Sequence, residues 1–287
     1  MEDVAPAPRR TVLVTGTTSG IGRETARQLA KLGARVVMGV RDVGRGEALA
    51  RRIRDEGGLA EVLPLDLASF ASVRDAAARF SEAHPSLDVL VNNAGVALRE
   101  RQVSVDGYEL TWQTNFLGGY LLTRLLLPAL RRGARPRVLN VSSEGHRSGR
   151  IDWDDLELSR GYGGFRAYAN TKLAQILFTR ELARREPGIA VTALHPGALA
   201  TRIWREAPLI PLRVVILSVL WLAGTGMPSA PRGARPVVRL AWDPALEGMT
   251  GRYFRRFRET APSEAAVDDA AAARLWDIAA RETGLTA

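Results

Sequence analysis

Short apolar segments alternate with amphipathic helical stretches over the first 195 residues, and this alternation limits the possible folds more than any other feature. The apolar segments are predicted as strands at 11–15, 35–40, 61–65, 88–91, 137–141 and 190–194. The stretches between them are predicted as helices at 24–32, 46–56, 69–83, 109–130 and 167–185. Strands and helices that alternate at this spacing form a parallel sheet with helices on both faces. Because crossovers between parallel strands are right-handed, the predicted fold class is α/β, a doubly wound parallel sheet of the Rossmann type.

After residue 198 this alternation ends, and residues 207–226 are very apolar and interrupted by prolines. The sequence contains no linker, repeat or low-complexity segment. Residues 1–287 are therefore predicted to form a single domain, with a polar tail at 1–9 and an apolar lid over the substrate at 198–228. The remaining C-terminal elements are predicted as a helix at 233–242, a short strand at 252–254 and a terminal helix at 262–281.

The net charge of +9, from 40 basic and 31 acidic residues, raises the question of a nucleic-acid partner. All but two of the basic residues are arginines, and they are spread along the whole chain, so no nucleic-acid partner is expected. The absence of cysteine excludes disulfides, thiolate metal sites and cysteine nucleophiles. His84, His146 and His195 have no further ligands at a suitable spacing, so no metal site is predicted.

The first ten residues are polar and proline-rich and lack the apolar core of a signal peptide. The longest largely apolar run, 214–223, is too short to span a bilayer alone. We therefore predict a cytoplasmic protein with at most peripheral membrane contact through 207–226. The same apolar residues predict a wall of the substrate pocket, and hence a small lipophilic substrate. A helix packed in the core or a contact between subunits is the alternative.

A glycine-rich turn links the first predicted strand to the first predicted helix. Gly16, Gly20 and Gly22 follow the spacing G-x-x-x-G-x-G. Glycines let a backbone turn tightly and approach a pyrophosphate, and the N-terminus of the following helix offers free N–H groups and a positive dipole. An ordinary tight turn could use the same residues, but the position between a strand and a helix favours a dinucleotide site.

The end of the second strand bears on the choice of dinucleotide. In such folds a residue about 20 positions beyond the first glycines contacts the adenosine ribose, and an acid there repels a 2′-phosphate. Val40 occupies this position and Arg41 follows it. Because a guanidinium suits a phosphate, NADP(H) is preferred over NAD(H), with a solvated surface arginine as the alternative. Asp66, just after the third strand, could bond to the adenine amino group or hold a turn.

The candidate catalytic residues follow in the second half of the alternating region. Tyr168 and Lys172 are four positions apart and share one face of a predicted helix. A free phenol has a pKa of about 10, and a neighbouring ammonium stabilises the phenolate and lowers that pKa. Ser143 follows the fifth strand and could donate to a substrate carbonyl or cap a helix. Asn115 lies in an apolar helix, where its amide either holds a water or bonds to the strand-four backbone.

In their order along the chain these motifs resemble the short-chain dehydrogenase/reductase family over about residues 11–200. From the fifth strand onward the chain resembles the retinol-dehydrogenase branch, in VSSEGHRSGRIDWDDL, AYANTKLAQILFTRELARR, HPGALATRI and the terminal GRYF and RLWD. The 25 positions between Ser143 and Tyr168 exceed the gap in many members, and the inserted residues resemble the same branch. The matching elements are the TGxxxGIG turn at 15–22, Asp66, the Asn-Asn-Ala-Gly run at 92–95, Asn115, Ser143, Tyr168 with Lys172, and Pro196-Gly197.

The resemblance implies hydride transfer between NADP(H) and a lipophilic alcohol/carbonyl pair of the retinol/retinal type. A carbonyl oxygen would lie between Ser143 and Tyr168, and Tyr168 would donate the proton. Lys172 would lower the pKa of the tyrosine and bind the nicotinamide ribose, while Asn115 would hold a water linking Lys172 to solvent. In oxidation the tyrosinate would act as the base. The implied cofactor-binding residues are Gly16, Thr18, Ser19, Gly20, Ile21, Gly22, Arg41, Asp66, Leu67, Asn93, Ala94, Gly95, Tyr168, Lys172, Pro196, Gly197 and Thr201.

Two other functions are compatible with these motifs. One is a reductase of steroid, polyketide or xenobiotic carbonyls, and the other is a non-catalytic dinucleotide-sensing protein. The complete set of Asn115, Ser143, Tyr168 and Lys172 disfavours the sensor. The resemblance also implies a homodimer or homotetramer, since many members of the family pair through helices equivalent to 109–130 and 167–185.

Overall fold

The computed structural model describes residues 9–197 and 229–286, and the described residues build one eight-stranded sheet. Its strands are β1 (Thr11–Thr15), β2 (Arg35–Val40), β3 (Leu59–Pro64), β4 (Val89–Asn92), β5 (Arg137–Val141), β6 (Ala190–His195), β7 (Arg252–Arg255) and β8 (Arg258–Glu259). They are arranged in the order β3–β2–β1–β4–β5–β6–β7–β8. Neighbours from β3 to β7 run parallel, and β8 pairs antiparallel with β7.

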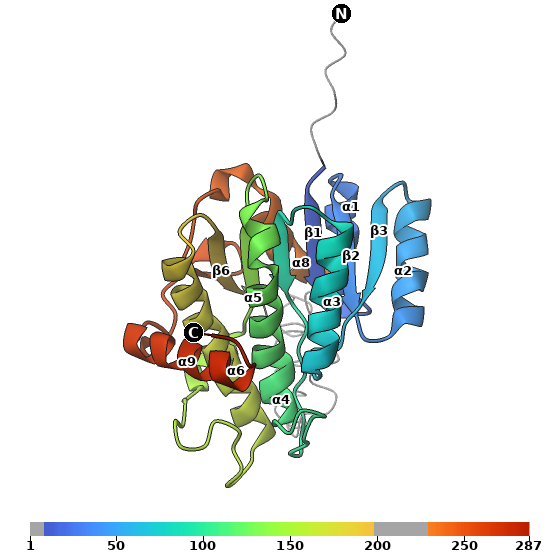
Figure 1. The fold of residues 1–287 in the computed structure, drawn as a ribbon. Coiled ribbons are helices and arrows are strands. Elements are labelled where there is room, and N and C mark those ends of the chain that lie inside the picture. Colours follow the sequence, from blue (N-terminus) through green and yellow to red (C-terminus); the bar gives the residue numbers. More distant parts are fainter. Residues whose placement is uncertain (1–8, 198–228, 287) are drawn as a thin grey trace, which may run out of the picture.

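Helices cover both faces of the sheet. The described helices are α1 (Gly20–Lys31), α2 (Val43–Asp55), α3 (Phe70–Ala83), α4 (Leu110–Trp112), α5 (Gly118–Arg131), α6 (Gly164–Arg185), α8 (Ala230–Trp242) and α9 (Asp269–Glu282). Helices α3, α5 and α6 lie in front of the sheet in Figure 1, and their apolar side chains share one core. Helices α1, α2 and α8 contribute to the core on the other face. The predicted α/β, doubly wound, Rossmann-type fold is confirmed.

Each central strand is apolar on both sides because it supplies both cores. Leu13 of β1 belongs to the core beneath α3, α5 and α6, whereas Val12 and Val14 belong to the core beneath α1, α2 and α8. All three side chains are fully buried. This two-sided burial accounts for the continuous run of aliphatic residues in β1, which is typical of parallel sheets.

The order of the strands reverses direction beside β1. The chain builds outward from β1 to β3 and then returns to place β4 on the other side of β1. In doubly wound sheets ligands bind beyond the carboxyl ends of the strands at this point. The loops that follow β1 and β4 are therefore the first place to look for a site.

Most predicted helices agree with the structure to within four residues at each end, and two differ by more. The helix predicted at 109–130 is interrupted by a π-helical turn at Gln113–Leu117, between α4 and α5. The helix predicted at 262–281 begins at Asp269, because the Asp268 side chain accepts a hydrogen bond from the Ala271 N–H and so caps α9 there.

The lid predicted at 198–228, with its segment 207–226, and most of the polar tail at 1–9 lie outside the described residues. None of the helices within 9–197 and 229–286 is long and apolar enough to cross a bilayer.

Helix α9 covers part of the surface formed by α5 and α6 (Figure 1). The Trp276 ring packs against Tyr120 and Phe178, with centroid separations of 5.3 and 5.9 Å. The guanidinium groups of Arg124 and Arg185 lie over the same indole at 4.5 and 4.6 Å. These are the two helices that we expected to pair between subunits, so such pairing has to accommodate α9. The homodimer or homotetramer stays a prediction.

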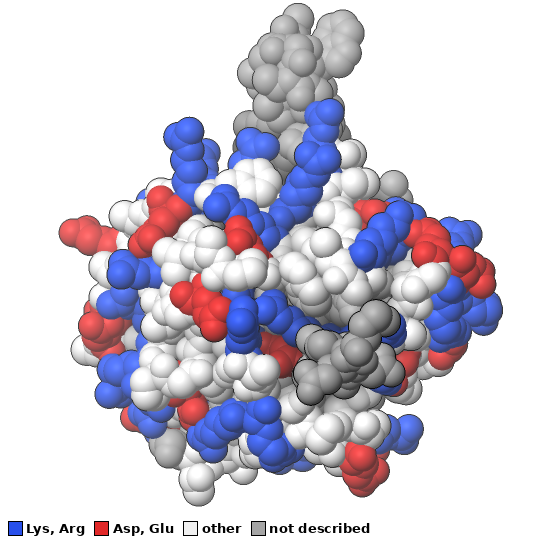
Figure 2. Space-filling model, turned by 90° about the horizontal axis from the view of Figure 1, so that it is seen from above, with Lys and Arg blue, Asp and Glu red and all other residues white. Residues whose placement is uncertain are grey.

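Basic and acidic side chains are interspersed on the face of the molecule seen in Figure 2. Many charges on the described surface form ion pairs, such as Arg27 with Glu56 at 2.8 Å and Arg252 with Glu259 at 3.2 Å. Exposed pairs of this kind contribute little to stability. On the face seen in Figure 2 the basic side chains are interrupted by acidic and uncharged ones, whereas nucleic-acid binding typically uses a continuous basic stripe.

Candidate active site

The carboxyl ends of five strands bring most of the predicted site residues to one edge of the sheet. Gly16 follows β1, Arg41 follows β2, Asn93 follows β4, Ser143 lies two residues beyond β5, and Gly197 lies two residues beyond β6. Tyr168 and Lys172 reach this edge from α6. The predicted residue Thr201 lies outside the described part of the chain.

The turn after β1 is too tight for residues other than glycine at two points. A Cβ on Gly22 would lie 2.3 Å from the carbonyl oxygen of Gly16 and 2.4 Å from Nδ2 of Asn93. Gly16 has a φ of +71°, and a Cβ there would lie 2.8 Å from Cα of Ala94. The turn is therefore packed directly against the loop that follows β4, with the predicted residues Thr18, Ser19, Gly20 and Ile21 at its tip and at the start of α1.

The N-terminus of α1 retains its positive character. Ser19 occupies the N-cap position, but its side chain makes no capping hydrogen bond, and the first turn of α1 contains no acidic residue. The N–H groups and dipole of this turn are thus not neutralised by the helix itself, as an anion-binding helix start requires.

Thr15 and Asn93 hold the turn in place. The Thr15 hydroxyl accepts hydrogen bonds from the N–H groups of Asn93 and Ala94, both at 3.0 Å. The Asn93 amide donates to the Thr15 carbonyl at 2.8 Å and to that of Gly16 at 3.3 Å. Asn93 was predicted to bind the cofactor, and the structure uses its side chain to join β1 to β4. Thr15 was predicted only as the first residue of the glycine turn, and its bonds to residues 93 and 94 were missed because these residues lie in the loop after β4.

Arg41 and Asp66 follow β2 and β3 at the same edge of the sheet. Arg41 is exposed and makes no hydrogen bond or ion pair with any other described residue. Its neighbour Asp42 caps α2 by accepting from the Arg45 N–H at 3.0 Å. Asp66 holds a turn, since its Oδ1 accepts from the Ala68 N–H at 3.0 Å. The adjacent predicted residue Leu67 is buried.

Ser143 and Tyr168 form a hydroxyl pair. Tyr168 is 5% exposed, and its hydroxyl is hydrogen-bonded to Ser143. A Cβ on Gly145 would lie 3.5 Å from both Ser143 Oγ and Tyr168 Cε1, so Gly145 leaves room beside this pair. Ser143 Oγ also accepts from the Gly145 N–H at 3.1 Å, the capping role considered as an alternative. Ser142 points elsewhere and donates to the Lys172 carbonyl at 2.8 Å.

His146 anchors the turn that carries Ser143. Its Nδ1 lies 2.7 Å from the Ser143 carbonyl oxygen, and its Nε2 accepts from the Ser263 N–H at 3.1 Å. The imidazole is fully buried, and burial lowers its pKa. A neutral ring with its proton on Nδ1 satisfies both contacts. His146 therefore connects the Ser143 turn to the C-terminal part of the chain.

Lys172 lies beside the Tyr168 ring, deep in the protein. Its Nζ is 5.3 Å from the centroid of that ring and 2.9 Å from the Val141 carbonyl oxygen. Lys172 is 3% exposed, and a Cβ on the predicted cofactor residue Gly95 would lie 3.6 Å from its Nζ. The expected neighbours Tyr168 and Lys172 are thus brought together.

Burial has the largest effect on the pKa values of Tyr168 and Lys172. It lowers the pKa of Lys172 to about 7 and raises the pKa of Tyr168 above its usual value near 10, although the hydrogen bond to Ser143 opposes that rise. The net direction at Tyr168 is thus set by burial, and the lowering of its pKa that we expected from Lys172 stays a prediction. Tyr168 is a protonated phenol at neutral pH, which is the form that can donate a proton.

Asn115 lies in the π-helical turn and bonds to the loop after β4. Its Oδ1 accepts from the Val96 N–H at 2.7 Å, and its Nδ2 donates to the Val96 carbonyl at 2.8 Å and to the Thr171 hydroxyl at 3.1 Å. Of the two alternatives considered for this amide, the structure shows the bond to the backbone that follows strand four. The Asn115 main-chain carbonyl accepts from Nε2 of Gln175 at 2.8 Å, a contact that the sequence analysis missed.

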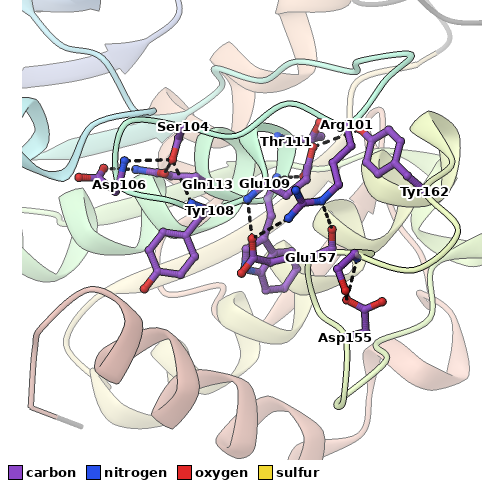
Figure 3. Close-up of polar contacts among 12 residues, drawn as sticks. Arg101, Ser104, Asp106, Tyr108, Glu109, Thr111, Gln113, Asp155, Glu157 and Tyr162 are labelled. Carbon is purple, nitrogen blue, oxygen red and sulfur yellow. Dashed lines mark hydrogen bonds and ion pairs between the residues drawn. The ribbon is translucent and has the colours of Figure 1, made fainter.

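The segment inserted between Ser143 and Tyr168 is tied to the start of the helix that carries Asn115 (Figure 3). The Glu109 carboxylate caps α4 by accepting from the N–H groups of Thr111 and Trp112. From the inserted segment, the Tyr162 hydroxyl donates to Glu109 Oε1 at 3.1 Å, and Glu157 accepts from the Glu109 N–H at 2.7 Å. These contacts hold the insertion against the start of α4.

The end of β6 supplies the last predicted residues. Pro196 and Gly197 follow His195, and Gly197 has a φ of +111° that disfavours any side chain. Burial lowers the pKa of His195 to about 4, so its imidazole is neutral at physiological pH. Within the described ranges, no cluster of three or more histidine or acidic side chains could hold a metal ion.

Comparison with known proteins matches residues 10–209 to the family model described as short chain dehydrogenase. Human retinol dehydrogenase 14 is 40% identical over 96% of this chain and 87% of its own length. Mouse polyprenol dehydrogenase is 43% identical over 97% of this chain and 85% of its own length. The RhlG/NADP active-site complex from Pseudomonas aeruginosa superimposes with a TM-score of 0.69 and 30% identity, over 86% of this chain and 94% of that one.

Proposed function

The chain belongs to the short-chain dehydrogenase family, in the retinol-dehydrogenase-like branch. It is thus an oxidoreductase whose fold binds a nicotinamide dinucleotide. On this basis we propose that it is an NADP(H)-dependent enzyme that transfers hydride between the nicotinamide and a lipophilic alcohol/carbonyl pair of the retinol/retinal type. The observation that carries the proposal is the Ser143–Tyr168 hydroxyl pair beside Lys172, at the same sheet edge as the glycine turn.

The turn after β1 fits a dinucleotide. The space that a Cβ on Gly22 would fill is occupied by the Gly16 carbonyl and the Asn93 side-chain amide, so only glycine lets the start of α1 pack this closely against the turn. The uncompensated N-terminus of α1 suits a pyrophosphate. Residues of this turn and Ala94 would hold the phosphates, and Lys172 would hold the nicotinamide ribose. When bound, the reduced nicotinamide supplies the hydride that the carbonyl carbon takes up.

The protein's own groups handle the proton. The Tyr168 phenol is protonated at neutral pH and donates to the carbonyl oxygen as the hydride reaches the carbonyl carbon, which leaves an alcohol and a tyrosinate. The Ser143 hydroxyl donates to the same oxygen and orients it. The Lys172 amine stabilises the tyrosinate. In the reverse direction the tyrosinate accepts the proton, so the rate of alcohol oxidation rises with pH.

The preference for NADP(H) rests on Arg41, whose exposed guanidinium is not engaged by any other described residue. In NADP-bound relatives such as the Pseudomonas complex the nucleotide carries a 2′-phosphate, and a guanidinium binds that group well.

Replacing Arg41 with aspartate is expected to lower kcat/KM with NADPH about 10- to 100-fold, the value of one charge-assisted hydrogen bond. Arg51→Asp makes the same charge change farther along α2 and is expected to leave the NADPH to NADH ratio unchanged. An equal loss in both variants would contradict a specific role for Arg41.

The lipophilic substrate class rests on two supports. Retinol and polyprenol, named in the two relatives, are both lipophilic alcohols. Residues 207–226 are strongly apolar in sequence, although they lie outside the described residues. Peripheral membrane contact through 207–226 of a cytoplasmic enzyme belongs to the same proposal. Steroid, polyketide or xenobiotic carbonyls remain the alternative substrates.

Initial rates with a panel of carbonyls, each with NADPH and with NADH, test this function. We expect retinal and other long apolar aldehydes to be reduced with NADPH in preference to small hydrophilic carbonyls. Activity confined to hydrophilic substrates would contradict the substrate class, and equal rates with NADH would contradict the cofactor preference. NADPH binding without turnover of any carbonyl would favour the dinucleotide-sensing alternative.

A further inference from the structure

The side-chain amide of Gln175 bridges Lys172 and Asn115. Gln175 is three residues after Lys172 on α6 and is 4% exposed. Its Oε1 accepts from Lys172 Nζ at 3.0 Å, and its Nε2 donates to the Asn115 main-chain carbonyl at 2.8 Å. Because a carbonyl oxygen can only accept, the amide nitrogen must face Asn115 and the amide oxygen must face Lys172. The orientation of Gln175 is therefore set by its partners.

The Asn115 end of this bridge is itself rigid. The Asn115 side chain is held by Val96 and Thr171, as described above. Around it the helix forms a π-helical turn, in which the Gly118 N–H bonds to the carbonyl of Gln113 five residues back. Turns of this kind occur frequently at functional sites. Gln175 thus connects Lys172 to a fixed point on a different helix.

The charged form of Lys172 is stabilised by hydrogen bonds to neutral groups. Among the described residues, its two acceptors are the Val141 carbonyl on β5 and Oε1 of Gln175. The π-helical turn presents the uncharged Asn115 to this region, and the loop after β4 presents Gly95. The titratable group that faces it is Tyr168 on its own helix, and no charged residue among those described contributes to the shift of its pKa, which burial alone lowers to about 7. Removing one of two acceptors should therefore have a large effect on the ammonium form.

We propose that Gln175 is a positioning residue of this active site. Its side chain links the Lys172 amine to the Asn115 carbonyl by hydrogen bonds and so keeps the amine charged and fixed beside Tyr168. A glutamine with only a structural role would pack within α6 and satisfy the hydrogen bonds of its own amide, without any effect on the charge of Lys172. The kinetic consequence rests on the proposed function, whereas the effect on the Lys172 charge does not.

The chain offers a direct measurement of this charge, because its two lysines are Lys31 and Lys172. Protein labelled with ¹³C at the lysine Cε positions gives two resonances, and Lys31→Arg assigns them. Lys31 has a side chain that is 60% exposed and serves as the internal reference. In Gln175→Met without nucleotide, we expect the pKa of Lys172 to fall by about one unit or more, the value of a hydrogen bond to a charged group. The pKa of Lys31 should stay the same.

Thr179→Val is the matched control. Thr179 is buried one turn farther along α6, where its hydroxyl accepts from Nδ2 of Asn140 and donates to the main-chain carbonyl of Gln175. Its replacement removes a buried polar group of the same helix and should lower the melting temperature without moving the Lys172 pKa. If Gln175→Met does not fold, Gln175→Asn keeps the amide but is one methylene too short to span both partners, and it should give the same direction of shift. An unchanged Lys172 pKa in a folded Gln175 variant would overturn the proposal.

The pH profile of alcohol oxidation supplies the second readout. The ammonium form of Lys172 stabilises the tyrosinate. In Gln175→Met this form is lost at lower pH, so alcohol oxidation near pH 7 should be slower than in the wild type, whereas at alkaline pH Lys172 is neutral in both proteins. The variant should be about tenfold slower near pH 7 and recover at alkaline pH, a pattern that a loss of stability does not produce. A profile parallel to that of the wild type would contradict the proposal. If the wild-type protein turns over no alcohol, the proposed function fails, and the lysine titration still decides the role of Gln175.

Discussion

Replacing Tyr168 with phenylalanine is expected to lower kcat for carbonyl reduction by about 10³-fold, within the range that a general acid contributes. The variant loses the proton donor but keeps the aromatic ring beside Lys172 and the hydroxyl of Ser143. The glycine turn and the start of α1 are untouched, so the Kd for NADPH should not change. Stopped-flow or steady-state kinetics with a carbonyl substrate, together with NADPH fluorescence titration, separate these two effects.

Tyr108→Phe is the control for this substitution. The Tyr108 hydroxyl donates to the Glu282 carbonyl at 3.0 Å, a contact with the C-terminus of α9. Its loss should leave both kcat and the Kd for NADPH at wild-type values. Turnover of Tyr168→Phe at a rate close to that of Tyr108→Phe would show that the proton comes from another group and would contradict the mechanism.

Replacing Gly22 with alanine is expected to weaken NADPH binding about 10- to 100-fold. The new Cβ would lie 2.3 Å from the Gly16 carbonyl oxygen and 2.4 Å from the Asn93 amide nitrogen, so the turn must shift to accept it. Overpacking of this kind costs about 1–3 kcal/mol, and the shift moves the backbone that would face the pyrophosphate. Isothermal titration with NADPH measures the loss.

Gly188→Ala tests whether any glycine replacement has this effect. No atom lies within 4 Å of the position that a Cβ on Gly188 would take. The residue is exposed, next to Pro187, in the loop between α6 and β6. Its replacement should leave NADPH affinity unchanged. Wild-type affinity in Gly22→Ala, with the fold intact by circular dichroism, would place the dinucleotide elsewhere.

The sequence predicted the central strands well because their pattern has one interpretation. Residues 11–15, 35–40 and 137–141 are short, mostly aliphatic and almost entirely buried between two helical layers, and the structure gives them the predicted bounds. The helix predicted at 109–130 was wrong in its middle, because its interruption depends on tertiary partners of Asn115. Periodicity along one segment carries no information about a bond to Val96 or Gln175.

The candidate site was predictable where spacing and resemblance both applied. Tyr168 and Lys172 lie four residues apart on α6, and such spacing places two side chains on one face of a helix. The hydrogen bond from the Asn93 side chain to Thr15 was not predictable, since Thr15 becomes a neighbour of Asn93 only when β4 pairs with β1. The protonation of Lys172 was missed for a similar reason. An interaction between two charges can be anticipated from the sequence, but the burial that lowers the lysine pKa requires the whole fold.

Transfer of a deuterium label tests the central claim most directly. The purified protein is supplied with retinal and with NADPH that carries deuterium at C4 of the nicotinamide, on one face or the other in separate reactions. The account predicts that retinol from one of the two reactions carries a single deuterium on the former carbonyl carbon, and that Tyr168→Phe abolishes its formation. Protein that binds the labelled NADPH but yields no deuterated alcohol from retinal or from any other apolar carbonyl would contradict it.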